Sequence, residues 1–246
     1  MNMKNEISKF IKKLSTTERA PALRKHRIMG ELITHIASLK RVRLFYKNPA
    51  NTHALSVIKK VKKETEMLLN DLQAYQIYMA VTKTEKIKGD IAEVGVYKGG
   101  SAKLICEMTK KKTVHLFDTF EGLPDLSPQD SEEQFQKGEY SAQLDYVKKV
   151  LKNYTHIQFY KGFFPSTAEP VKNKMFSFVH LDVDIYKSTL SSLAFFYFRM
   201  SRGGIIISHD YPSSKGVKKA FDEFYQDKPE HIIELPLCDQ CIVIKL

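Results

Sequence analysis

The sequence predicts a doubly wound α/β fold, in which a mostly parallel sheet is covered by helices on both faces, with a helical N-terminal extension. From Ile87 onward, short apolar runs alternate with helical stretches and glycine-containing turns, a pattern typical of strands and helices around a parallel sheet. Before that point the chain has no glycine between Gly30 and Gly89 and carries helical periodicity. We therefore expect a basic helical extension over residues 1–85 and an α/β domain over residues 86–246.

Composition limits the class of protein. A chain of 246 residues with 43% hydrophobic and 27% charged residues fits one globular core with an appendage. No apolar run approaches the roughly 18 residues that span a bilayer, and the N-terminus lacks a signal-peptide core. The three cysteines are too few, and odd in number, for a disulfide framework. We expect a cytoplasmic protein without a membrane span.

The net charge of +11 is concentrated near the N-terminus, since residues 1–66 hold 16 Lys and Arg against 5 Asp and Glu. A basic arm of this kind can meet nucleic acid, an anionic membrane surface or an acidic partner. A solvated basic helical face is the commoner explanation, and no recognised nucleic-acid-binding motif accompanies the charge.

The extension is predicted to be a set of helices broken near Pro21, Pro49 and Asn51. Beyond these breaks, apolar spacings of three and four place one stripe on a single helix face: Ile58, Val61, Thr65, Leu68, Leu72, Tyr75 and Met79. Burial of the stripe against the α/β domain is favoured. A homodimer through the N-terminal helices is the alternative.

Seven apolar runs are predicted to be strands, and helices fill the gaps between them. The runs are Asp90 to Val94, Thr113 to Asp118, Ile157 to Lys161, Phe176 to Asp182, Gly204 to His209, His231 to Leu235 and Gln240 to Lys245. The best-marked helix follows Gly216, where Val217, Ala220, Phe221, Phe224 and Tyr225 share one face.

The first strand runs into a glycine turn between Glu93 and Ser101, and a helix follows. Ligands of open α/β sheets bind beyond the carboxyl ends of the strands, where glycine lets the backbone approach them. The spacing is not that of the dinucleotide fingerprint. Glu93 would repel a phosphate but attract a cationic group, such as the sulfonium or ammonium of S-adenosylmethionine. A plain βα turn would explain Gly95 and Gly99 but not the acid beside them.

The second strand ends in Asp118, 25 residues after Glu93. A carboxylate at this edge can accept two hydrogen bonds from a ribose diol. A helix-capping role is the competing interpretation.

Acidic residues gather at the ends of the fourth and fifth strands. The fourth ends in Asp182 and Asp184, which alternation would place on one face if the strand continued to 184, and the fifth ends in His209 and Asp210. Burying several anions together is costly unless a cation or protons neutralise them. We therefore expect a divalent metal here, with a remaining carboxylate to take a proton from a hydroxyl substrate.

Taken together, these segments resemble the macrocin O-methyltransferases, with a more distant likeness to catechol O-methyltransferase. The matching stretches span about residues 86–228: EVGVYKGGSA, FDTFEGLP, GEYSA, FYKGFF, HLDVDIYKSTL, GGIIISHDY and GVKKAFDEF. The resemblance implies a Rossmann-like class I methyltransferase sheet of seven strands with the last antiparallel. It also implies methylation of a hydroxyl of a small-molecule acceptor, such as a sugar or glycosylated compound.

The resemblance further implies a site for each group. S-adenosylmethionine would be bound by Glu93, Gly95, Tyr97, Gly99, Ser101 and Asp118. A metal, Mg²⁺ or Mn²⁺, would be held by Asp182, His209 and Asp210, with Asp184 as the general base.

One position departs from the family pattern, which has two acids where this chain has His209-Asp210. His209 is then a ligand that favours a softer ion such as Mn²⁺, or lies outside the shell, or is itself a base. Two other functions stay open: an RNA-binding or RNA-modifying protein that uses the basic arm, and a non-catalytic methyltransferase-like scaffold.

Overall fold

The computed structural model describes residue 42 and residues 44–131 and 134–246. The chain divides into two compact units, Met1–Thr52 and His53–Leu246. In the first unit, residues 44–47 are helical, and the 3₁₀ helix η1, Pro49–Asn51, is capped by the Asn48 side chain, which accepts from the Ala50 N–H at 3.0 Å. The break predicted near Pro21, and most of the basic arm, lie outside the described residues.

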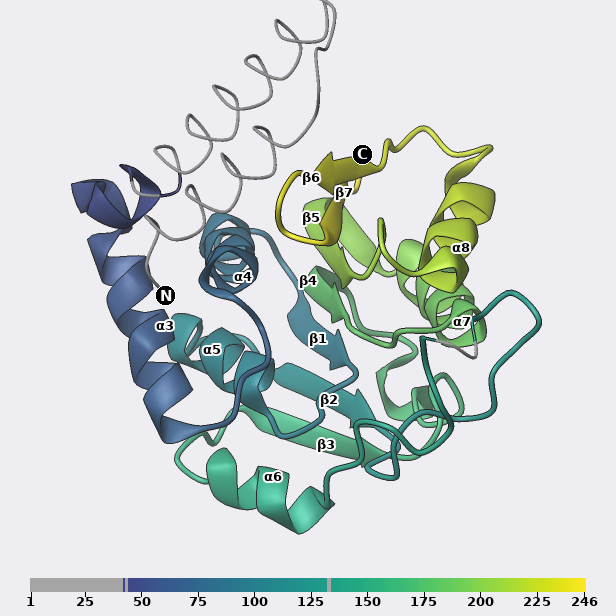
Figure 1. The fold of residues 1–246 in the computed structure, drawn as a ribbon, viewed down its shortest axis with the longest axis horizontal. Helices are drawn as coiled ribbons and strands as arrows, with labels where there is room; N and C mark the ends of the chain where they lie inside the picture. Colours follow the sequence, from purple (N-terminus) through teal and green to yellow (C-terminus); the bar gives the residue numbers. More distant parts are fainter. Residues whose placement is uncertain (1–41, 43, 132–133) are drawn as a thin grey trace, which may run out of the picture. The chain divides into compact units, whose positions relative to one another are not determined.

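The second unit contains a seven-stranded sheet and the helices that cover it (Figure 1). Its elements in chain order are α3 Thr52–Glu64, α4 Asp71–Thr84, β1 Asp90–Val94, α5 Gly100–Met108, β2 Val114–Asp118, α6 Leu144–Val150, β3 Ile157–Lys161, η2 Glu169–Val171, β4 Phe176–Leu181, α7 Tyr186–Tyr197, β5 Met200–His209, α8 Lys215–Tyr225, β6 Ile233–Leu235 and β7 Gln240–Ile244. The predicted strands all form, with ends that differ by up to four residues.

The strand order is β3-β2-β1-β4-β5-β7-β6. Strands β1 to β5 pair in parallel, whereas β7 runs antiparallel to both β5 and β6. The direction of winding reverses between β1 and β4. Such a switch point opens a crevice at the carboxyl ends of the two strands, where α/β proteins bind ligands. The doubly wound fold with an antiparallel last strand is therefore confirmed.

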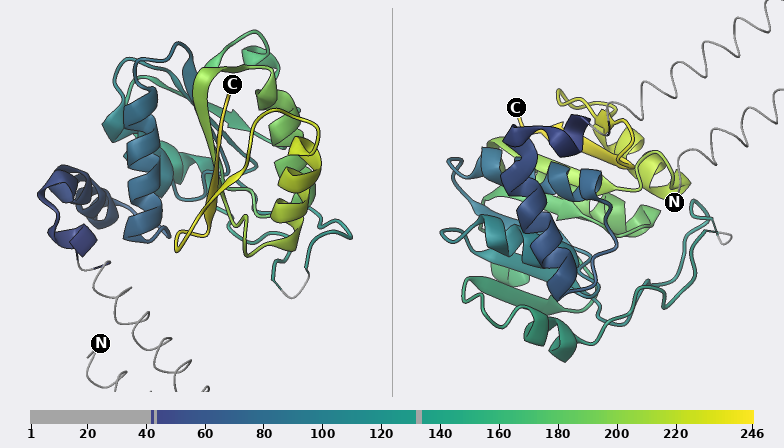
Figure 2. Two further views of the ribbon diagram at one scale, coloured as in Figure 1. Left: turned by 90° about the horizontal axis from the view of Figure 1, so that it is seen from above. Right: turned by 60° about the vertical axis from the view of Figure 1, so that its left-hand side comes forward.

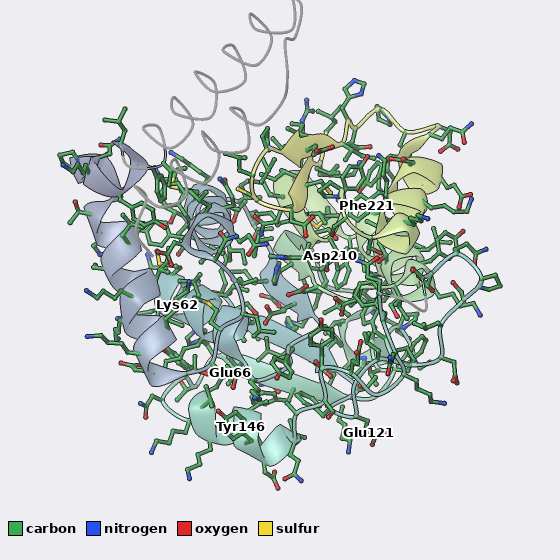
Figure 3. The ribbon with its side chains drawn as sticks, viewed as in Figure 1. Lys62, Glu66, Glu121, Tyr146, Asp210 and Phe221 are labelled. Atoms are coloured by element: carbon green, nitrogen blue, oxygen red, sulfur yellow. The ribbon has the colours of Figure 1, made fainter. Side chains whose placement is uncertain are left out.

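Helices cover both faces of the sheet, so its central strands are apolar almost throughout. Figure 2 shows α4 on one side of the strands and α8 on the other. Successive residues of a strand enter different cores: Leu116 packs in the cluster beneath α3, α4 and α5, and Phe117 in the cluster beneath α7 and α8. Phe221 of α8, labelled in Figure 3, is fully buried in the second cluster and contributes roughly 2–3 kcal/mol of stability.

The apolar stripe predicted on one helix is divided between two. Helix α3 ends at Glu64 and α4 begins at Asp71 after an Asn70 cap. Ile58 and Val61 are buried in the first core cluster, as the favoured interpretation expects, but Leu68 lies between the helices with 62% of its surface exposed. The single helix was wrong because Asn70 and Gln73 form a capping box that starts a new helix.

The structure joins α3 and α4 to the α/β domain, because the compact unit that holds the sheet begins at His53 rather than near residue 86. The functional division at residue 85 stays a prediction, and so does a homodimer through the N-terminal helices. Within the part of the chain that the structure describes, no helix is long and apolar enough to cross a membrane.

Candidate active site

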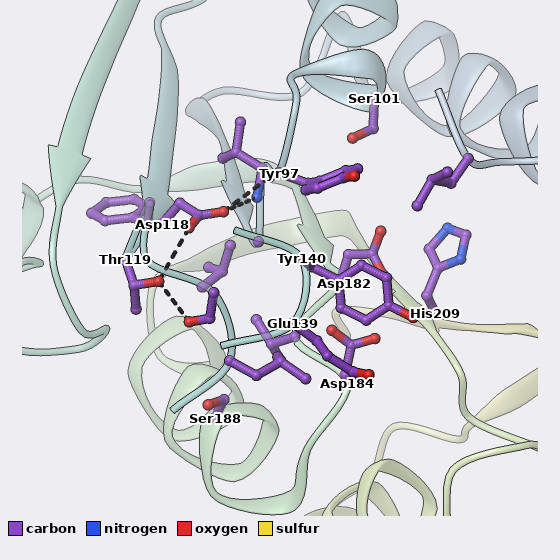
Figure 4. A pocket seen from close by; sticks show the side chains of 18 of the residues that line it. Tyr97, Ser101, Asp118, Thr119, Glu139, Tyr140, Asp182, Asp184, Ser188 and His209 are labelled. Atoms are coloured by element: carbon purple, nitrogen blue, oxygen red, sulfur yellow. Dashed lines mark hydrogen bonds between the residues drawn. The ribbon is translucent and has the colours of Figure 1, made fainter. Parts of the chain in front are cut away.

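A cavity of about 270 Å³ opens at the carboxyl ends of β1, β2, β4 and β5 (Figure 4). The walls come from the turns after these strands, from the α3–α4 connection and from the segment around Tyr140. Side chains from widely separated parts of the sequence line it, among them Glu66 and Asp210, which are labelled in Figure 3. The cavity lies at the switch point of the sheet.

The turn after β1 requires glycine at its first position. Gly95 has a φ of +87°, and a Cβ on it would lie 1.8 Å from the backbone oxygen of Asp182. The backbone of β1 therefore passes directly against the segment that follows β4. This close approach joins the glycine turn to the acidic residues after β4.

Asp118 organises the same turn. One carboxylate oxygen accepts from the N–H groups of Val96 (2.6 Å) and Tyr97 (2.9 Å), and the other accepts from the N–H of Phe120 at 2.6 Å. The Thr119 hydroxyl lies 3.5 Å from the second oxygen but donates at 2.8 Å to the Gly122 backbone oxygen, so roughly one of the about four lone-pair sites of the carboxylate remains for a ligand. The carboxylate also holds its own loop, and the predicted hydrogen bonds from a ribose diol stay a prediction.

The connection between α3 and α4 forms a wall that the sequence did not indicate. Glu66, Met67, Leu68 and Leu69 all line the cavity. The backbone here lies against the start of α5, since a Cβ on Gly100 would meet the Met67 Cα at 2.7 Å. The capping box that ends the connection was the only signal in the sequence.

Three carboxylates meet on the opposite side of the cavity. Asp182, Asp184 and Asp210 each offer an oxygen, and these oxygens lie within 4.8 Å of one another. Burial, and then the charges of Asp182 and Asp210, raise the pKa of Asp184 well above its ordinary value. Burial and the charge of Asp182 raise the pKa of Asp210 to about 7. The cluster resists carrying three negative charges unless a cation or protons compensate them.

The carboxylates converge through turns and not through strand alternation, because β4 ends at Leu181. Asp184 has a φ of +61° and Asp210 a φ of +58°. Four of the seven described non-glycine residues with positive φ line the cavity: Tyr97, Tyr140, Asp184 and Asp210. Such conformations cost of the order of 1–3 kcal/mol each and cluster at functional sites, where the surrounding structure enforces them.

Glu93 is the predicted cofactor residue whose position differs most from expectation. Its carboxylate is fully buried and does not line the cavity; it forms a 2.7 Å hydrogen bond with His180 Nδ1. Glu93 and His180 are partners in the register of β1 and β4. Burial raises the pKa of Glu93, while burial alone would lower the pKa of His180 and the bond with Glu93 raises it. A charge expected to face a cationic ligand is thus already paired inside the sheet.

His209 lies beside a second group of ligand atoms. His180, Asp182 and His209 each offer one atom within 4.8 Å of the others, so the expected set of Asp182, His209 and Asp210 is divided between two groups that share Asp182. Gln240 of β7 lies 2.7 Å from His209 Nε2. Burial lowers the pKa of His209 to about 4.

Most of the other predicted cofactor residues line the cavity, and one lies outside it. Gly95, Tyr97, Ser101 and Asp118 line the cavity, whereas Gly99 lies just outside as the N-cap of α5. Sequence reasoning gave no role to Glu139 and Tyr140, which line the cavity opposite Tyr97. The Tyr140 and Tyr97 rings meet edge to face at 5.9 Å. The GEYSA stretch was the signal for both.

The known proteins that this chain resembles are methyltransferases. The family model described as macrocin-O-methyltransferase (TylF) matches residues 65–240. Demethyldecarbamoylnovobiocin O-methyltransferase of Streptomyces niveus is 26% identical over 72% of this chain and 69% of its own length. Mycinamicin III 3''-O-methyltransferase of Micromonospora griseorubida is 25% identical over 51% of this chain and 56% of its own length.

A third relative is the 8-demethyl-8-(2,3-dimethoxy-alpha-L-rhamnosyl)-tetracenomycin-C 4'-O-methyltransferase of Streptomyces olivaceus, 27% identical over 58% of this chain and 60% of its own length. Two solved structures share the fold, each with a TM-score of 0.61. The O-methyltransferase NovP is 24% identical, and the match covers 69% of this chain and 78% of NovP. The calicheamicin methyltransferase CalS11 is 16% identical, and the match covers 80% of this chain and 93% of CalS11.

Proposed function

Because this chain belongs to the macrocin-O-methyltransferase family and is an S-adenosylmethionine-dependent O-methyltransferase, we propose that it methylates a hydroxyl group of a sugar or glycosylated small molecule. The names of two relatives support this substrate class, since one acts on a rhamnosyl-bearing compound and the other on mycinamicin III. The observation that carries the proposal is one cavity with the Asp118 turn on one side and three carboxylates on the other.

The cofactor would lie against the turn after β1. Gly95, Tyr97, Ser101 and Asp118 would contact S-adenosylmethionine, and Asp118 retains about one acceptor site for a ribose hydroxyl. Glu93 would act from within the sheet by fixing β1 to β4 through His180, rather than by contact with the cofactor. The α3–α4 connection would exclude water from the same side.

A divalent cation fits the carboxylates. Their raised pKa values show that Asp184 and Asp210 are destabilised as anions, and a hard oxygen donor set suits Mg²⁺. Asp182 and Asp210 would hold the ion, which would supply positive charge beside the reacting hydroxyl, and Asp184 would stay outside the ligand set.

Asp184 is the proposed general base. The acceptor oxygen attacks the methyl carbon in line with the departing sulfur, the carbon–sulfur bond breaks, and S-adenosylhomocysteine leaves as a neutral thioether. Burial and the charges of Asp182 and Asp210 raise the pKa of Asp184, and an ion at those two residues would offset their charges and keep Asp184 ionised until it accepts the hydroxyl proton. Tyr140 would pack against the acceptor at the cavity mouth.

The six carboxylates among the described lining residues disfavour a nucleic-acid acceptor, because they would repel its phosphates: Glu66, Asp118, Glu139, Asp182, Asp184 and Asp210. The basic arm lies largely outside the described residues. A non-catalytic scaffold would not require the paired donor and acceptor sides of one cavity.

Two substitutions test the proposal. Asp118→Asn should weaken S-adenosylhomocysteine binding at least about tenfold in calorimetry, because an amide nitrogen would face the loop N–H groups. Asp184→Asn should keep that affinity and lower kcat about 10²–10⁴-fold with an accepted glycoside. Asp145→Asn, at an exposed position on α6, is the control. Unchanged cofactor binding in Asp118→Asn would remove the proposed cofactor position.

A further inference from the structure

A second group of potential ligands lies directly beside the three carboxylates. His180 of β4, Asp182 just after β4 and His209 at the end of β5 each offer one atom within 4.8 Å of the others. The two imidazole rings meet edge to face at 5.1 Å. His180 is fully buried and His209 is 4% exposed, so the group lies deeper in the sheet than Asp184 and Asp210.

His180 is arranged as a histidine ligand is. Its Nδ1 is bonded to the buried carboxylate of Glu93 at 2.7 Å, while its Nε2 is buried without a partner among the described residues. Metal-binding histidines characteristically donate one ring N–H to a carboxylate, which directs the other nitrogen to the ion. A purely structural His180–Glu93 pair would explain the first contact but would leave a buried nitrogen unsatisfied, at a cost of about 1–3 kcal/mol.

Gln240 restrains His209 in a similar way. Its side-chain amide lies 2.7 Å from His209 Nε2, so the other ring nitrogen, Nδ1, is left for a ligand. The structure places the Gln240 amide nitrogen at this distance and 3.5 Å from the Gln73 backbone oxygen. Exchanging the amide nitrogen and oxygen, which occupy nearly the same space, gives up the long Gln73 contact but lets Nε2–H donate to Gln240, so that Nδ1 keeps its lone pair. The Gln240 oxygen is itself buried without a partner among the described residues, and this orientation supplies one.

We propose that His180, Asp182 and His209 form a nitrogen-rich cation position that takes a transition-metal ion such as Mn²⁺, Co²⁺ or Zn²⁺. Two imidazoles and one carboxylate favour such ions over Mg²⁺, which prefers oxygen donors. The inference rests on the proposed function only in that Asp182 also belongs to the carboxylate group. Asp184 and Asp210 are not ligands of this second position, which shares only Asp182 with the carboxylate group.

The test measures metal binding directly. Protein freed of metal with a chelator is titrated with Mg²⁺, Mn²⁺ and Co²⁺ by equilibrium dialysis, and the Mn²⁺ complex is studied by pulsed electron paramagnetic resonance. Co²⁺ should bind at least about tenfold more tightly than Mg²⁺, and the Mn²⁺ spectrum should show couplings to nitrogen from two imidazoles. Mn²⁺ bound without nitrogen couplings would overturn the proposal.

Variants assign the ligands. His209→Asp should lose one nitrogen coupling and shift the preference toward Mg²⁺, and His180→Gln should lower Mn²⁺ affinity. Glu93→Gln should weaken Mn²⁺ about 10–100-fold through the orientation of His180. His156→Gln is the matched control, because His156 also has a buried unpartnered Nε2 but belongs to neither ligand group.

Folding and cofactor binding are checked separately by thermal unfolding and by S-adenosylhomocysteine calorimetry. If His180→Gln does not fold, His209→Asp alone decides, since unchanged nitrogen couplings in that variant contradict the proposal. Normal methyl transfer with Mg²⁺ but no nitrogen couplings would reject the second position and leave the proposed function standing. Nitrogen couplings without methyl transfer would support the second position and count against the proposed function.

Discussion

Gly95 determines how closely the glycine turn approaches the segment after β4. Gly95→Ala would place a Cβ 1.8 Å from the Asp182 backbone oxygen, so β1 and β4 would have to separate at their carboxyl ends. We expect a lower melting temperature and at least about tenfold weaker S-adenosylhomocysteine binding, as both sides of the cavity move. Thermal unfolding and calorimetry measure the two effects.

Gly138→Ala is the control for this substitution. Gly138 has a φ of +85°, close to that of Gly95, but no described atom would lie within 4 Å of the added Cβ. It therefore carries only the left-handed strain, about 1–2 kcal/mol. If the two variants lost stability and affinity equally, the close approach of Gly95 would not be the cause.

Glu230, which pairs with a residue near the C-terminus, should make the folding stability of the protein depend on pH. It accepts a 2.9 Å hydrogen bond from the Tyr197 hydroxyl and pairs with Lys245. Burial alone would raise the pKa of Glu230, but the hydrogen bonds from Lys245 and Tyr197 hold it below its ordinary value of 4.5. For a depressed carboxyl pKa, the stabilisation is present above the unfolded pKa and is lost as pH falls through the folded one.

Glu230→Gln should therefore be less stable than the parent protein by roughly 2 kcal/mol at neutral pH. The difference should shrink as pH falls below about 4.5. Melting temperatures across this range measure it. Glu169→Gln, which removes an exposed pair with Lys172, should change little at any pH. If the stability difference between the parent protein and Glu230→Gln stayed constant down to the lowest pH at which the protein folds, Glu230 would not be the source of the pH dependence.

At the scale of elements, the break between α3 and α4 builds one wall of the cavity. Asn70 caps α4 by accepting from the N–H groups of Leu72 (2.9 Å) and Gln73 (3.0 Å), and Gln73 bonds back to the Asn70 N–H. Asn70→Ala should cost about 1 kcal/mol and weaken S-adenosylhomocysteine binding, because the wall at Glu66 to Leu69 loses its fixed end.

The rescue variant is Asn70→Asp, which keeps a capping oxygen and should restore both the melting temperature and the affinity. Calorimetry and thermal unfolding on the three proteins measure this. A loss of affinity in Asn70→Asp equal to that in Asn70→Ala would show that the cap does not hold the wall.

Elements differed in how far the sequence could predict them. The central strands were located closely because a parallel strand covered on both faces is a short continuous apolar run. The sequence contains the capping-box residues Asn70 and Gln73, but the continuous apolar spacing from Ile58 to Met79 predicted a single helix across them. Helical periodicity continues in phase across a short connection, so spacing alone does not reveal a break of six residues.

Across the whole molecule, the sequence predicted that the acids would meet but not how they would be divided. The shared carboxyl edge of parallel strands brings Asp182 and Asp210 together whatever the detailed geometry. The two ligand groups depend instead on the turn at Asp184, on the β1–β4 register that pairs Glu93 with His180, and on the contact of Gln240 with His209. These are long-range contacts, which periodicity does not encode.

The charge of the cavity predicts which acceptors the whole molecule accepts. Among the described lining residues there are six carboxylates and no Lys or Arg, and a divalent cation would offset only part of this charge. A phosphate on the acceptor would enter a negative potential, so a neutral glycoside should show kcat/KM at least about tenfold higher than its phosphate ester.

Steady-state methyl transfer with such matched pairs measures the ratio of the two kcat/KM values, and added salt should lower this ratio by screening the charges. Glu139→Gln should also lower the ratio, because it removes one carboxylate from the cavity lining. Glu121→Gln, which lies outside the lining, should leave the ratio unchanged. A phosphate ester methylated as efficiently as its neutral parent would show that the carboxylates do not select the acceptor.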